Sequence, residues 1–296
     1  MSSPLSTYRI GIDGGGTHCR FALTTPGGRH ECVLGSANVH TDFKGTMEVL
    51  KAGLNELADA AGLPRERLGA VPSYAGLAGV TDETAADEIR HALQMDCLIV
   101  ADDRPSAVAG ALDRADGTVA GVGTGSFLAR QFAEEVTLLG GYGADLGDEA
   151  SGCWLGKQLL VRLLHCRDGL KPDSPLISEI WSEFDNRVSA VLKYAREATP
   201  SGFAGLAPRL VDAAQSGDPN GLELMKLGAA YIEKCLSALG RPEGESICLI
   251  GGLGKHYAGY LSGQVAACLS EPKGTALDGA LLLAETSSKR IQRAAL

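Results

Sequence analysis

The 296-residue sequence predicts an α/β fold made of two halves of related structure. A strand, a turn rich in glycine and hydroxyl residues, and a second strand occur at residues 8–25 and again at residues 118–132. Stretches with helical spacing of apolar residues separate the later strands, which indicates layers that include parallel strands. The length also exceeds what one compact core usually holds and therefore favours two domains.

The first half begins with a hairpin of Tyr8–Asp13 and Cys19–Thr25, after which a third strand is expected near Glu31–Leu34. Residues 43–61 have apolar side chains at helical spacing, with Asp42 as a candidate N-cap. The other elements expected in this half are strands at 70–75 and 97–101 and helices at 82–93 and 105–112.

The second half repeats the hairpin, with strands at Thr118–Val122 and Phe127–Phe132, and then becomes mainly helical. One more strand, Ser246–Ile250, runs into a glycine cluster and a following helix. The helices expected in the rest of the chain are 149–166, 177–198, 203–215, 221–239 and 276–287.

Composition and charge argue against several classes of protein. No run approaches the ~18 apolar residues of a membrane span, and residues 1–7 lack the apolar stretch of a secretory signal. The net charge is −9 without a basic block, so neither nucleic acid nor an anionic membrane is an expected partner. The eight cysteines are dispersed without a CxxC pair, and we expect reduced thiols in a cytoplasmic protein.

The first glycine turn has the residue types of a phosphate site. Gly14, Gly15 and Gly16 leave bare amides that can cradle phosphate oxygens, and Thr17 adds a hydroxyl donor. Asp13 supplies a carboxylate that could hold hydrated Mg²⁺. The turn is neither a Walker loop nor a dinucleotide fingerprint, because no Gly-Lys-Ser/Thr follows and the next element is a strand. A hairpin turn that merely tolerates glycine explains the run about equally well.

Two further glycine clusters add to this pattern. The turn at residues 123–126, Gly-Thr-Gly-Ser, is weak alone, but paired with the first turn it could grip the β- and γ-phosphates of a nucleotide. The cluster at residues 250–254 follows a buried strand, where missing side chains would let an adenine or ribose lie against backbone. A glycine turn required only for packing remains the alternative for this cluster.

Two pairs of acidic residues are candidates for chemistry. Asp102 and Asp103 end a central strand, where α/β folds place catalytic groups, although Asp103 could simply cap the next helix. Asp148 and Glu149 follow a glycine-rich loop and either contact a ligand or begin a helix. The six histidines are unclustered, so metal or triad chemistry built on them is not expected.

In this order the motifs resemble the sugar-kinase/hsp70/actin superfamily of ATP-binding proteins. Residues 11–17 resemble its first phosphate motif, residues 121–126 its second, and residues 249–254 its adenosine motif. Residues 107–112 and 276–283 resemble its two connecting helices of small residues. Because all five features occur in the right order over nearly the whole chain, the resemblance is specific where each single motif is not.

The Asp-Gly-Gly-Gly-Thr-His run is typical of the branch that contains the N-acetylglucosamine kinases and the activator ATPases of acyl-CoA dehydratases and benzoyl-CoA-type reductases. Further segments are most similar to the bacterial glucosamine kinases. These segments are residues 35–38, 77–79, 147–152, 168–172 and 217–219.

The resemblance implies two ribonuclease-H-like domains that flank a nucleotide cleft. The first would comprise residues 1–112 and 285–296, and the second residues 113–284. The implied reaction is phosphoryl transfer from MgATP to the 6-hydroxyl of glucosamine, with Mg²⁺ as cofactor. A homodimer is expected because relatives often form one.

The resemblance also implies roles for individual residues. Asp103 matches the general base that accepts the 6-hydroxyl proton, whereas relatives carry Thr or Asn at the position of Asp102. Asn38 matches a sugar-contacting asparagine. The second sugar-binding run would comprise Gly141, Tyr142 and Asp148, with Ser126 close by. Relatives that bind N-acetylglucosamine carry Trp at the position of Tyr142.

The implied ATP-binding residues come from all three glycine clusters. Gly205 matches a position that lines the adenine pocket, with Gly251 and Gly252 opposite. Asp13 is the residue expected to hold Mg²⁺ through water. The implied phosphate-binding residues are Gly14, Gly15, Gly16, Thr17, Thr124 and Gly125.

Three rival functions fit the same motifs. One is an N-acetylglucosamine kinase, and side-by-side kinetics on the two sugars separates it from a glucosamine kinase. A second is an activator ATPase with a cysteine-bound iron–sulfur cluster at a dimer interface, but Cys153 and Cys166 lack the expected glycine-flanked context. A third is a sugar-sensing regulator on a kinase fold, which would bind the sugar without consuming ATP.

Overall fold

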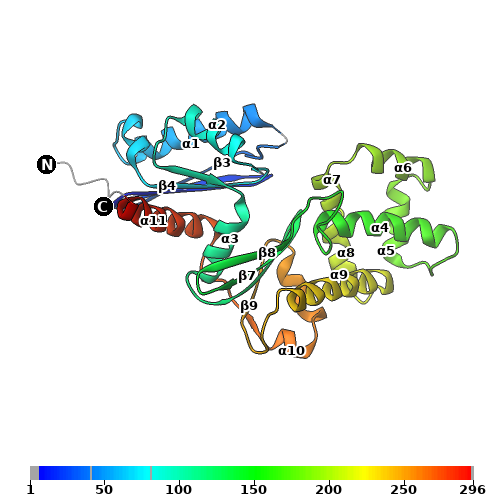
Figure 1. Ribbon diagram of the computed structural model, residues 1–296. Coiled ribbons are helices and arrows are strands. Elements are labelled where there is room, and N and C mark those ends of the chain that lie inside the picture. Colours follow the sequence, from blue (N-terminus) through cyan, green and yellow to red (C-terminus); the bar gives the residue numbers. More distant parts are fainter. Residues whose placement is uncertain (1–6, 41, 81, 295–296) are drawn as a thin grey trace. The chain divides into compact units, whose positions relative to one another are not determined.

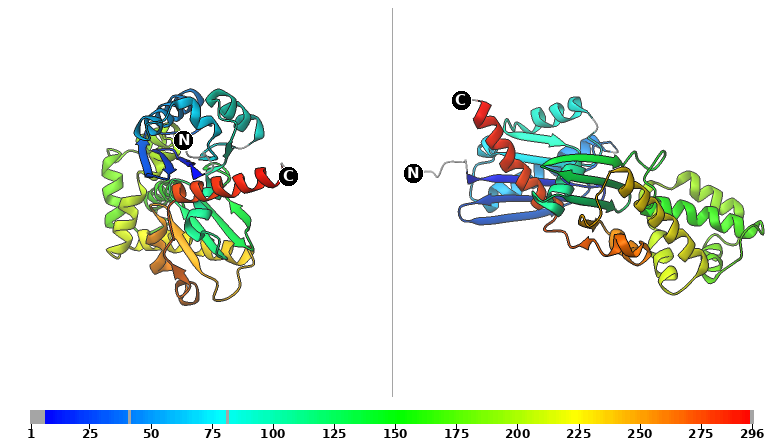
Figure 2. Two further views of the ribbon diagram at one scale, coloured as in Figure 1. Left: turned by 90° about the vertical axis from the view of Figure 1, so that its left-hand side faces the viewer. Right: turned by 60° about the horizontal axis from the view of Figure 1, so that its bottom comes forward.

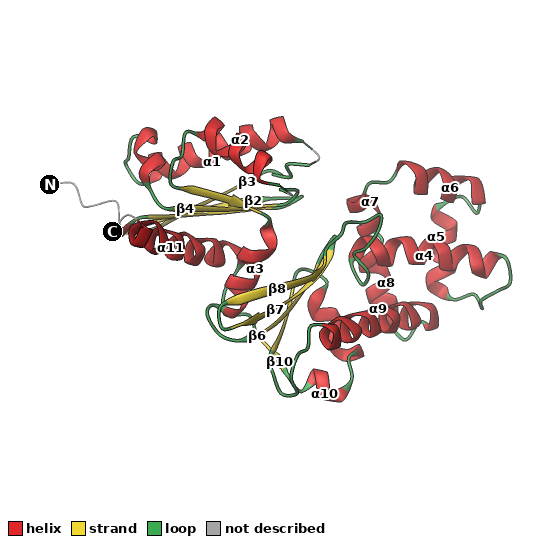
Figure 3. Ribbon diagram, viewed as in Figure 1, coloured by secondary structure: helices red, strands yellow, loops and turns green. Residues whose placement is uncertain are grey.

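The computed structural model describes residues 7–40, 42–80 and 82–294, and it divides into two compact units (Figure 1). The first unit comprises Met1–Arg114 and Pro272–Leu296, and the second comprises Ala115–Glu271. Each unit contains one five-stranded sheet (Figure 3). The prediction of two related α/β halves is therefore confirmed.

The sheet of the first unit has the strand order β3-β2-β1-β4-β5. The first three strands form an antiparallel meander, and β4 and β5 add in parallel to β1. The strands are β1 (Arg9–Gly14), β2 (Cys19–Thr25), β3 (Gly28–Leu34), β4 (Ser73–Leu77) and β5 (Leu98–Ala101). The carboxyl ends of the parallel strands are level, because Gly14 pairs with Leu77 and Gly76 pairs with Ala101.

Helices cover both faces of this sheet (Figures 1 and 2). The helices among the described residues are α1 (Phe43–Ala60), α2 (Glu83–Leu93), α3 (Asp103–Leu112) and α11 (Ala276–Ala294). Asp42 is the N-cap of α1, as predicted, and its side chain accepts the Gly45 amide at 2.8 Å. The helices α3 and α11 cross closely, since a Cβ atom on Gly279 would lie 1.9 Å from the Ser106 oxygen. Glycine is therefore required where these helices cross.

The second unit repeats the plan with the strand order β10-β9-β6-β7-β8. Its strands are β6 (Gly117–Val122), β7 (Ser126–Phe132), β8 (Glu135–Gly140), β9 (Ile247–Ile250) and β10 (Leu269–Ser270). Again an antiparallel meander, here β6, β7 and β8, is extended by parallel strands. The strands β8 and β10 were not predicted from the sequence.

A helical layer follows in the second unit and buries an apolar core against the sheet. Its helices are α4 (Gly152–Arg167), α5 (Pro175–Glu183), α6 (Val188–Glu197), α7 (Pro200–Ala204), α8 (Ala207–Gln215), α9 (Pro219–Ala238) and α10 (Gly263–Ala266). Leu159, Leu163, Leu210 and Ile232 are all fully buried in this core. The sheet that carries the second glycine turn therefore packs against these helices through a shared apolar core.

Several predicted boundaries differ from the observed ones. The helix expected at 177–198 is two helices, because Asp185 and Asn186 adopt positive φ values of 53° and 54° between them. The helix expected at 203–215 is also divided, with α8 beginning at Ala207 and a proline in its first turn. The strand expected at 70–75 begins at Ser73, since Arg65–Ala70 forms a 3₁₀ helix. A 3₁₀ helix, Gly254–Tyr260, follows β9.

The C-terminal boundary of the units also differs from the expected one. The expectation assigned only residues 285–296 to the first domain, whereas the first unit takes up the chain again at Pro272. The reason is packing, because α11 lies against α3, β1 and β4. The helix belongs to the sheet that it covers.

Candidate active site

The first glycine turn is held open by backbone contacts. The Gly15 amide donates to the His18 oxygen at 3.0 Å, and the Gly15 oxygen accepts the Ala37 amide at 3.0 Å. A Cβ atom on Gly14 would lie 2.5 Å from the Leu77 side chain, whereas one on Gly16 would meet nothing within 4 Å. Gly14 is thus required by packing, and Gly16 borders open space.

Asp13 lies at the end of β1, directly before this turn. Its pairing partner in the antiparallel hairpin is Arg20, whose guanidinium approaches the carboxylate at 3.5 Å. Burial raises the pKa of Asp13, and Arg20 partly offsets this effect. The motifs gave no indication of Arg20, although the hairpin register could have placed it opposite Asp13.

Asn38 is brought to the same edge of the sheet. It forms an isolated parallel bridge with Ala78, and the Ala78 amide donates to the Gly14 oxygen at 2.8 Å. The Asn38 side-chain oxygen accepts the His40 amide at 3.1 Å. Gly79 adopts a φ of +86°, and a Cβ atom there would lie 2.9 Å from that side-chain oxygen. The segments 35–38 and 77–79 are therefore neighbours of the first turn.

The adjacent acids Asp102 and Asp103 take different roles at the end of β5. Asp102 is the N-cap of α3, and its carboxylate accepts the Arg104 amide at 3.0 Å and also the Arg104 side chain. Asp103 is the first residue of the helix and is half-buried. The capping role that the sequence left open for Asp103 thus belongs to Asp102.

The surroundings of Asp103 are crowded and acidic. Burial, followed by the charges of Asp102 and Asp13, raises the pKa of Asp103 to about 6. A Cβ atom on Gly76 would lie 3.3 Å from the Asp103 Cα and 2.3 Å from the Ser106 hydroxyl. Gly76, which the motifs did not single out, lets the start of α3 lie on the strand.

The second unit places the second glycine turn on the N-terminus of α4. The amides of Gly152 and Cys153 donate to the oxygens of Gly123 and Thr124 at 2.8 and 3.1 Å. Ser151 is the N-cap of α4, so the helix begins after Asp148 and Glu149. The Ser126 hydroxyl donates to the Glu149 oxygen at 2.6 Å.

The β8–α4 loop, residues 141–151, contains the predicted second sugar-binding run. Asp148 is buried at 9 % exposure, and a Cβ atom on Gly125 would lie 2.7 Å from its carboxylate. Tyr142 is 77 % exposed and packs on Gly147 within the loop. Asp148 therefore adjoins the second turn, whereas Tyr142 projects outward.

The adenosine-motif glycines flank the same turn. Gly251 has a φ of +82°, and a Cβ atom there would lie 2.4 Å from the Val122 oxygen at the end of β6. Gly252 is exposed and meets nothing within 4 Å. Gly205 ends α7, which packs on the first turns of α4, and it is exposed as well. The second unit thus gathers Thr124, Gly205 and both glycines near one end of its sheet.

Two segments that support the family resemblance have structural roles instead. Asp218 accepts the amides of Asn220 and Gly221 at 2.9 and 3.0 Å and the Ser174 hydroxyl at 3.1 Å. It also accepts the Leu176 amide at 3.1 Å. One buried carboxylate therefore caps both α5 and α9, which gives the segment 217–219 a packing role. The segment 168–172 joins the same cluster, because the Asn220 side chain donates to the Pro172 oxygen at 3.1 Å.

The carboxylates of the first unit suit a hard divalent cation. Mg²⁺ prefers oxygen ligands and is usually held by one or two carboxylates together with waters and substrate phosphates. Asp13 and Asp103 are close enough for the charge of one to raise the pKa of the other. A cation at Asp13 would relieve this repulsion, so the residues present fit the expected ion.

Comparisons with known proteins agree with this arrangement. The sequence profile of the BadF/BadG/BcrA/BcrD ATPase family matches residues 10–283. The glucosamine kinase GspK of Vibrio cholerae is 28 % identical over 280 residues, which are 94 % of this chain and 95 % of that protein.

Solved structures show the same architecture. A Chromobacterium violaceum protein, provisionally described as an N-acetylglucosamine kinase, is 29 % identical, with a TM-score of 0.84 over 95 % of this chain and 100 % of the other. A ROK-family glucokinase of Streptomyces griseus, solved with glucose and AMPPNP, has a TM-score of 0.55 at 14 % identity over 96 % of this chain and 99 % of the other. These likenesses confirm the predicted α/β fold with two domains of the actin-like ATPase type.

Proposed function

We propose that this chain, which belongs to the BadF/BadG/BcrA/BcrD ATPase family, transfers the γ-phosphoryl group of ATP to the 6-hydroxyl of glucosamine. The near full-length likeness to a glucosamine kinase and to a protein described as an N-acetylglucosamine kinase supports a hexosamine kinase. Eight free thiols are typical of proteins from a reducing compartment and support a cytoplasmic location.

The observation that carries the proposal is the placement of Asp103. It is half-buried at the level carboxyl edge of β1, β4 and β5, the edge that also carries Asn38 and the first glycine turn. Its pKa of about 6 leaves it ionised near neutral pH yet basic enough to accept a proton. In the reaction, Asp103 would take the 6-hydroxyl proton while the sugar oxygen attacks the γ-phosphorus and ADP leaves. Such chemistry depends mainly on alignment and charge neutralisation.

The nucleotide would be bound by backbone rather than by basic side chains. The residues that would contact phosphate oxygens are Gly15, Gly16, Thr17, Thr124 and Gly125. The adenosine would lie against Gly205, Gly251 and Gly252, of which Gly252 borders open space. Asp13 would hold Mg²⁺ through water, and the ion supplies charge neutralisation at the phosphates when it is bound.

Preference for glucosamine over its acetylated form would come from Asp148. A free 2-amino group is cationic near neutral pH, so a carboxylate facing it favours the amine over an acetamide. Glu149 is less suited because it lies against the hydroxyl of Tyr231, whose pKa is raised by burial and further by Cys235 and Glu149. Asp148 instead adjoins Gly125 at the second turn.

A coupled ADP-release assay with MgATP over a panel of hexoses and aminohexoses tests the proposal. We expect the highest kcat/KM with glucosamine, and omission of Mg²⁺ should abolish turnover. A higher kcat/KM with N-acetylglucosamine would identify that sugar as the substrate instead. The assignment as a hexosamine kinase would still hold.

Two other outcomes would replace the proposal. Sugar-independent ATP hydrolysis together with stoichiometric iron and sulfide in an anaerobic preparation would identify an activator ATPase. Cys153 and Cys166 are buried in α4, which is a poor position for cluster ligands. Tight glucosamine binding without any ATP consumption would identify a sugar sensor.

A further inference from the structure

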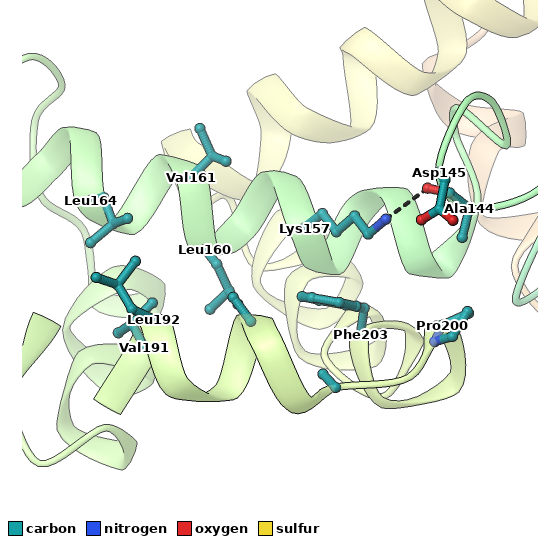
Figure 4. A pocket seen from close by; sticks show the side chains of 12 residues that line it. Ala144, Asp145, Lys157, Leu160, Val161, Leu164, Val191, Leu192, Pro200 and Phe203 are labelled. Carbon is teal, nitrogen blue, oxygen red and sulfur yellow. Dashed lines mark hydrogen bonds between the residues drawn. The ribbon is translucent and has the colours of Figure 1, made fainter. Parts of the chain in front are cut away.

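A groove of about 450 Å³ lies in the second unit between α4 on one side and α6 and α7 on the other (Figure 4). Its walls are apolar, with Leu160, Val191 and Phe203 among them. At the end of the groove nearest the β8–α4 loop, the ammonium group of Lys157 lies between Ala144 and Phe203 (Figure 4). Lys157 has no role in the motifs considered above.

The Phe203 side of this arrangement is held by contacts with α4 and α6. The ring is buried and meets the Tyr194 ring edge-on at a centroid distance of 5.9 Å. The Tyr194 hydroxyl donates to the Gly202 oxygen at 2.8 Å. A Cβ atom on Gly156 would lie 2.0 Å from the Phe203 oxygen, so α7 is seated directly on α4. None of these contacts depends on Lys157.

The β8–α4 loop has an irregular backbone, in which the Gly147 amide donates to the Gly143 oxygen at 2.9 Å. Gly141, Gly143, Asp148 and Ala150 all adopt positive φ values between 62° and 86°. The C-terminal end of the loop is fixed from outside, because the Tyr257 hydroxyl donates to the Ala150 oxygen at 2.6 Å. This contact fixes one end of the loop, so the segment around Ala144 depends on other contacts for its position.

Lys157 provides such a contact. Its Nζ atom donates to the Ala144 oxygen at 2.7 Å and lies 5.5 Å from the centroid of the Phe203 ring. A cation over an aromatic face is attracted by the ring quadrupole, and its hydrogen bond to a carbonyl is charge-assisted. The side chain therefore connects the middle of the loop to the fixed platform of α7.

We propose that Lys157 is a positioning residue that holds the β8–α4 loop in the conformation that binds the sugar. Its effect on sugar binding rests on the proposed function, because the loop carries Tyr142 and Asp148. Its tethering of the loop does not depend on any substrate. ATP binding should be largely unaffected, since Phe203 and the adjacent Gly205 are held by Gly156 and Tyr194.

Three variants isolate the role of the ammonium group. Lys157→Met retains a flexible side chain of similar length, which suits the apolar groove, but it removes the donor. Lys157→Arg retains both the cation and a donor. Lys193→Met, on the exposed surface of α6, is the matched control for loss of a lysine from the same unit.

Steady-state kinetics give the first readout. Lys157→Met should raise KM for glucosamine about tenfold while kcat and KM for ATP stay within about threefold, as expected for one lost charge-assisted bond at a half-exposed site. Lys157→Arg should restore KM to within about threefold, and Lys193→Met should match the wild type. An unchanged KM for glucosamine, an equal rise in both KM values, or no rescue by arginine would overturn the proposal.

Amide hydrogen exchange of the substrate-free protein gives the second readout. Peptides from residues 141–151 should exchange about tenfold faster in Lys157→Met than in the wild type, Lys157→Arg or Lys193→Met. Equal exchange in all four proteins would refute the tether itself. If the wild type released no ADP with any sugar, the proposed function would fail, yet the exchange experiment would still decide whether Lys157 holds the loop.

Discussion

The carboxylate of Asp102 accepts the backbone amide of Arg104 at 3.0 Å and thereby caps α3. Because the neighbouring acid provides the cap, Asp103 is left as a carboxyl group at the start of the helix and at the edge of the sheet. The two adjacent aspartates should therefore differ in their effect on catalysis.

The variants Asp103→Asn and Asp102→Asn form a matched pair. Asp103→Asn should lower kcat by about two to four orders of magnitude, the range for a lost general base, while ATP binding is retained. Asp102→Asn should keep kcat within about tenfold, because asparagine is also a good N-cap. Saturating kinetics and calorimetric titration with ATP measure both effects. Near-normal turnover of Asp103→Asn would contradict the assignment.

The pH dependence follows from the raised pKa of Asp103. Since only the carboxylate can accept a proton, kcat/KM of the wild type should fall as the pH falls through about 6. The measurement is kcat/KM for glucosamine between pH 5 and pH 8. A profile that is flat across this range would argue against Asp103 as the base.

The same pKa predicts the direction of a stability effect. The native pKa of Asp103 is above the unfolded value of about 3.9, so its favourable contribution is present below about pH 4 and is lost as the pH rises through about 6. Asp103→Asn should therefore raise Tm relative to the wild type by about 1–3 °C at pH 7.5 and by less at pH 4.5. Thermal melts at the two pH values test this, and a larger gain at the lower pH would have the wrong sign.

Gly251 and Gly252 are adjacent, but substitution by alanine should reduce folding stability at the first and ATP affinity at the second. At Gly251, the φ of +82° and the nearby Val122 oxygen leave no room for a Cβ atom, so Gly251→Ala should cost about 2 kcal/mol or more of folding stability. Gly252→Ala meets no protein atom within 4 Å and should fold normally but bind ATP more weakly. Denaturant unfolding and ATP titration separate the two effects. Unchanged ATP affinity in a stable Gly252→Ala protein would exclude this glycine from the nucleotide site.

The choice of sugar should depend on Asp148. Asp148→Asn tolerates the positive φ of 62° and should raise KM for glucosamine about tenfold or more, because a charge-assisted bond to the amine is lost. The kcat/KM for N-acetylglucosamine should stay within about threefold. Glu149→Gln is the control, and it should leave the ratio of the two substrates unchanged. A loss of activity toward both sugars in equal measure would indicate that Asp148 supports the loop and does not recognise the amine.

The sequence alone determined the features that are encoded by neighbouring residues. The two hairpins, their glycine turns, the Asp42 cap and the strand end before Asp102 were all predictable. Alternating or helical spacing, caps and glycine runs act within a few residues, so they can be identified without knowledge of the fold. The same motifs, taken in order, also indicated the family.

Only the tertiary structure decided which of these residues meet and which stand apart. It separated the roles of Asp102 and Asp103, placed Arg20 opposite Asp13, and assigned Asp218 to capping two helices. It also brought Lys157 to Ala144, thirteen positions earlier in the chain. Such contacts depend on burial and on partners that only packing brings together, because hydrogen bonds and charges act through space whatever the separation along the chain.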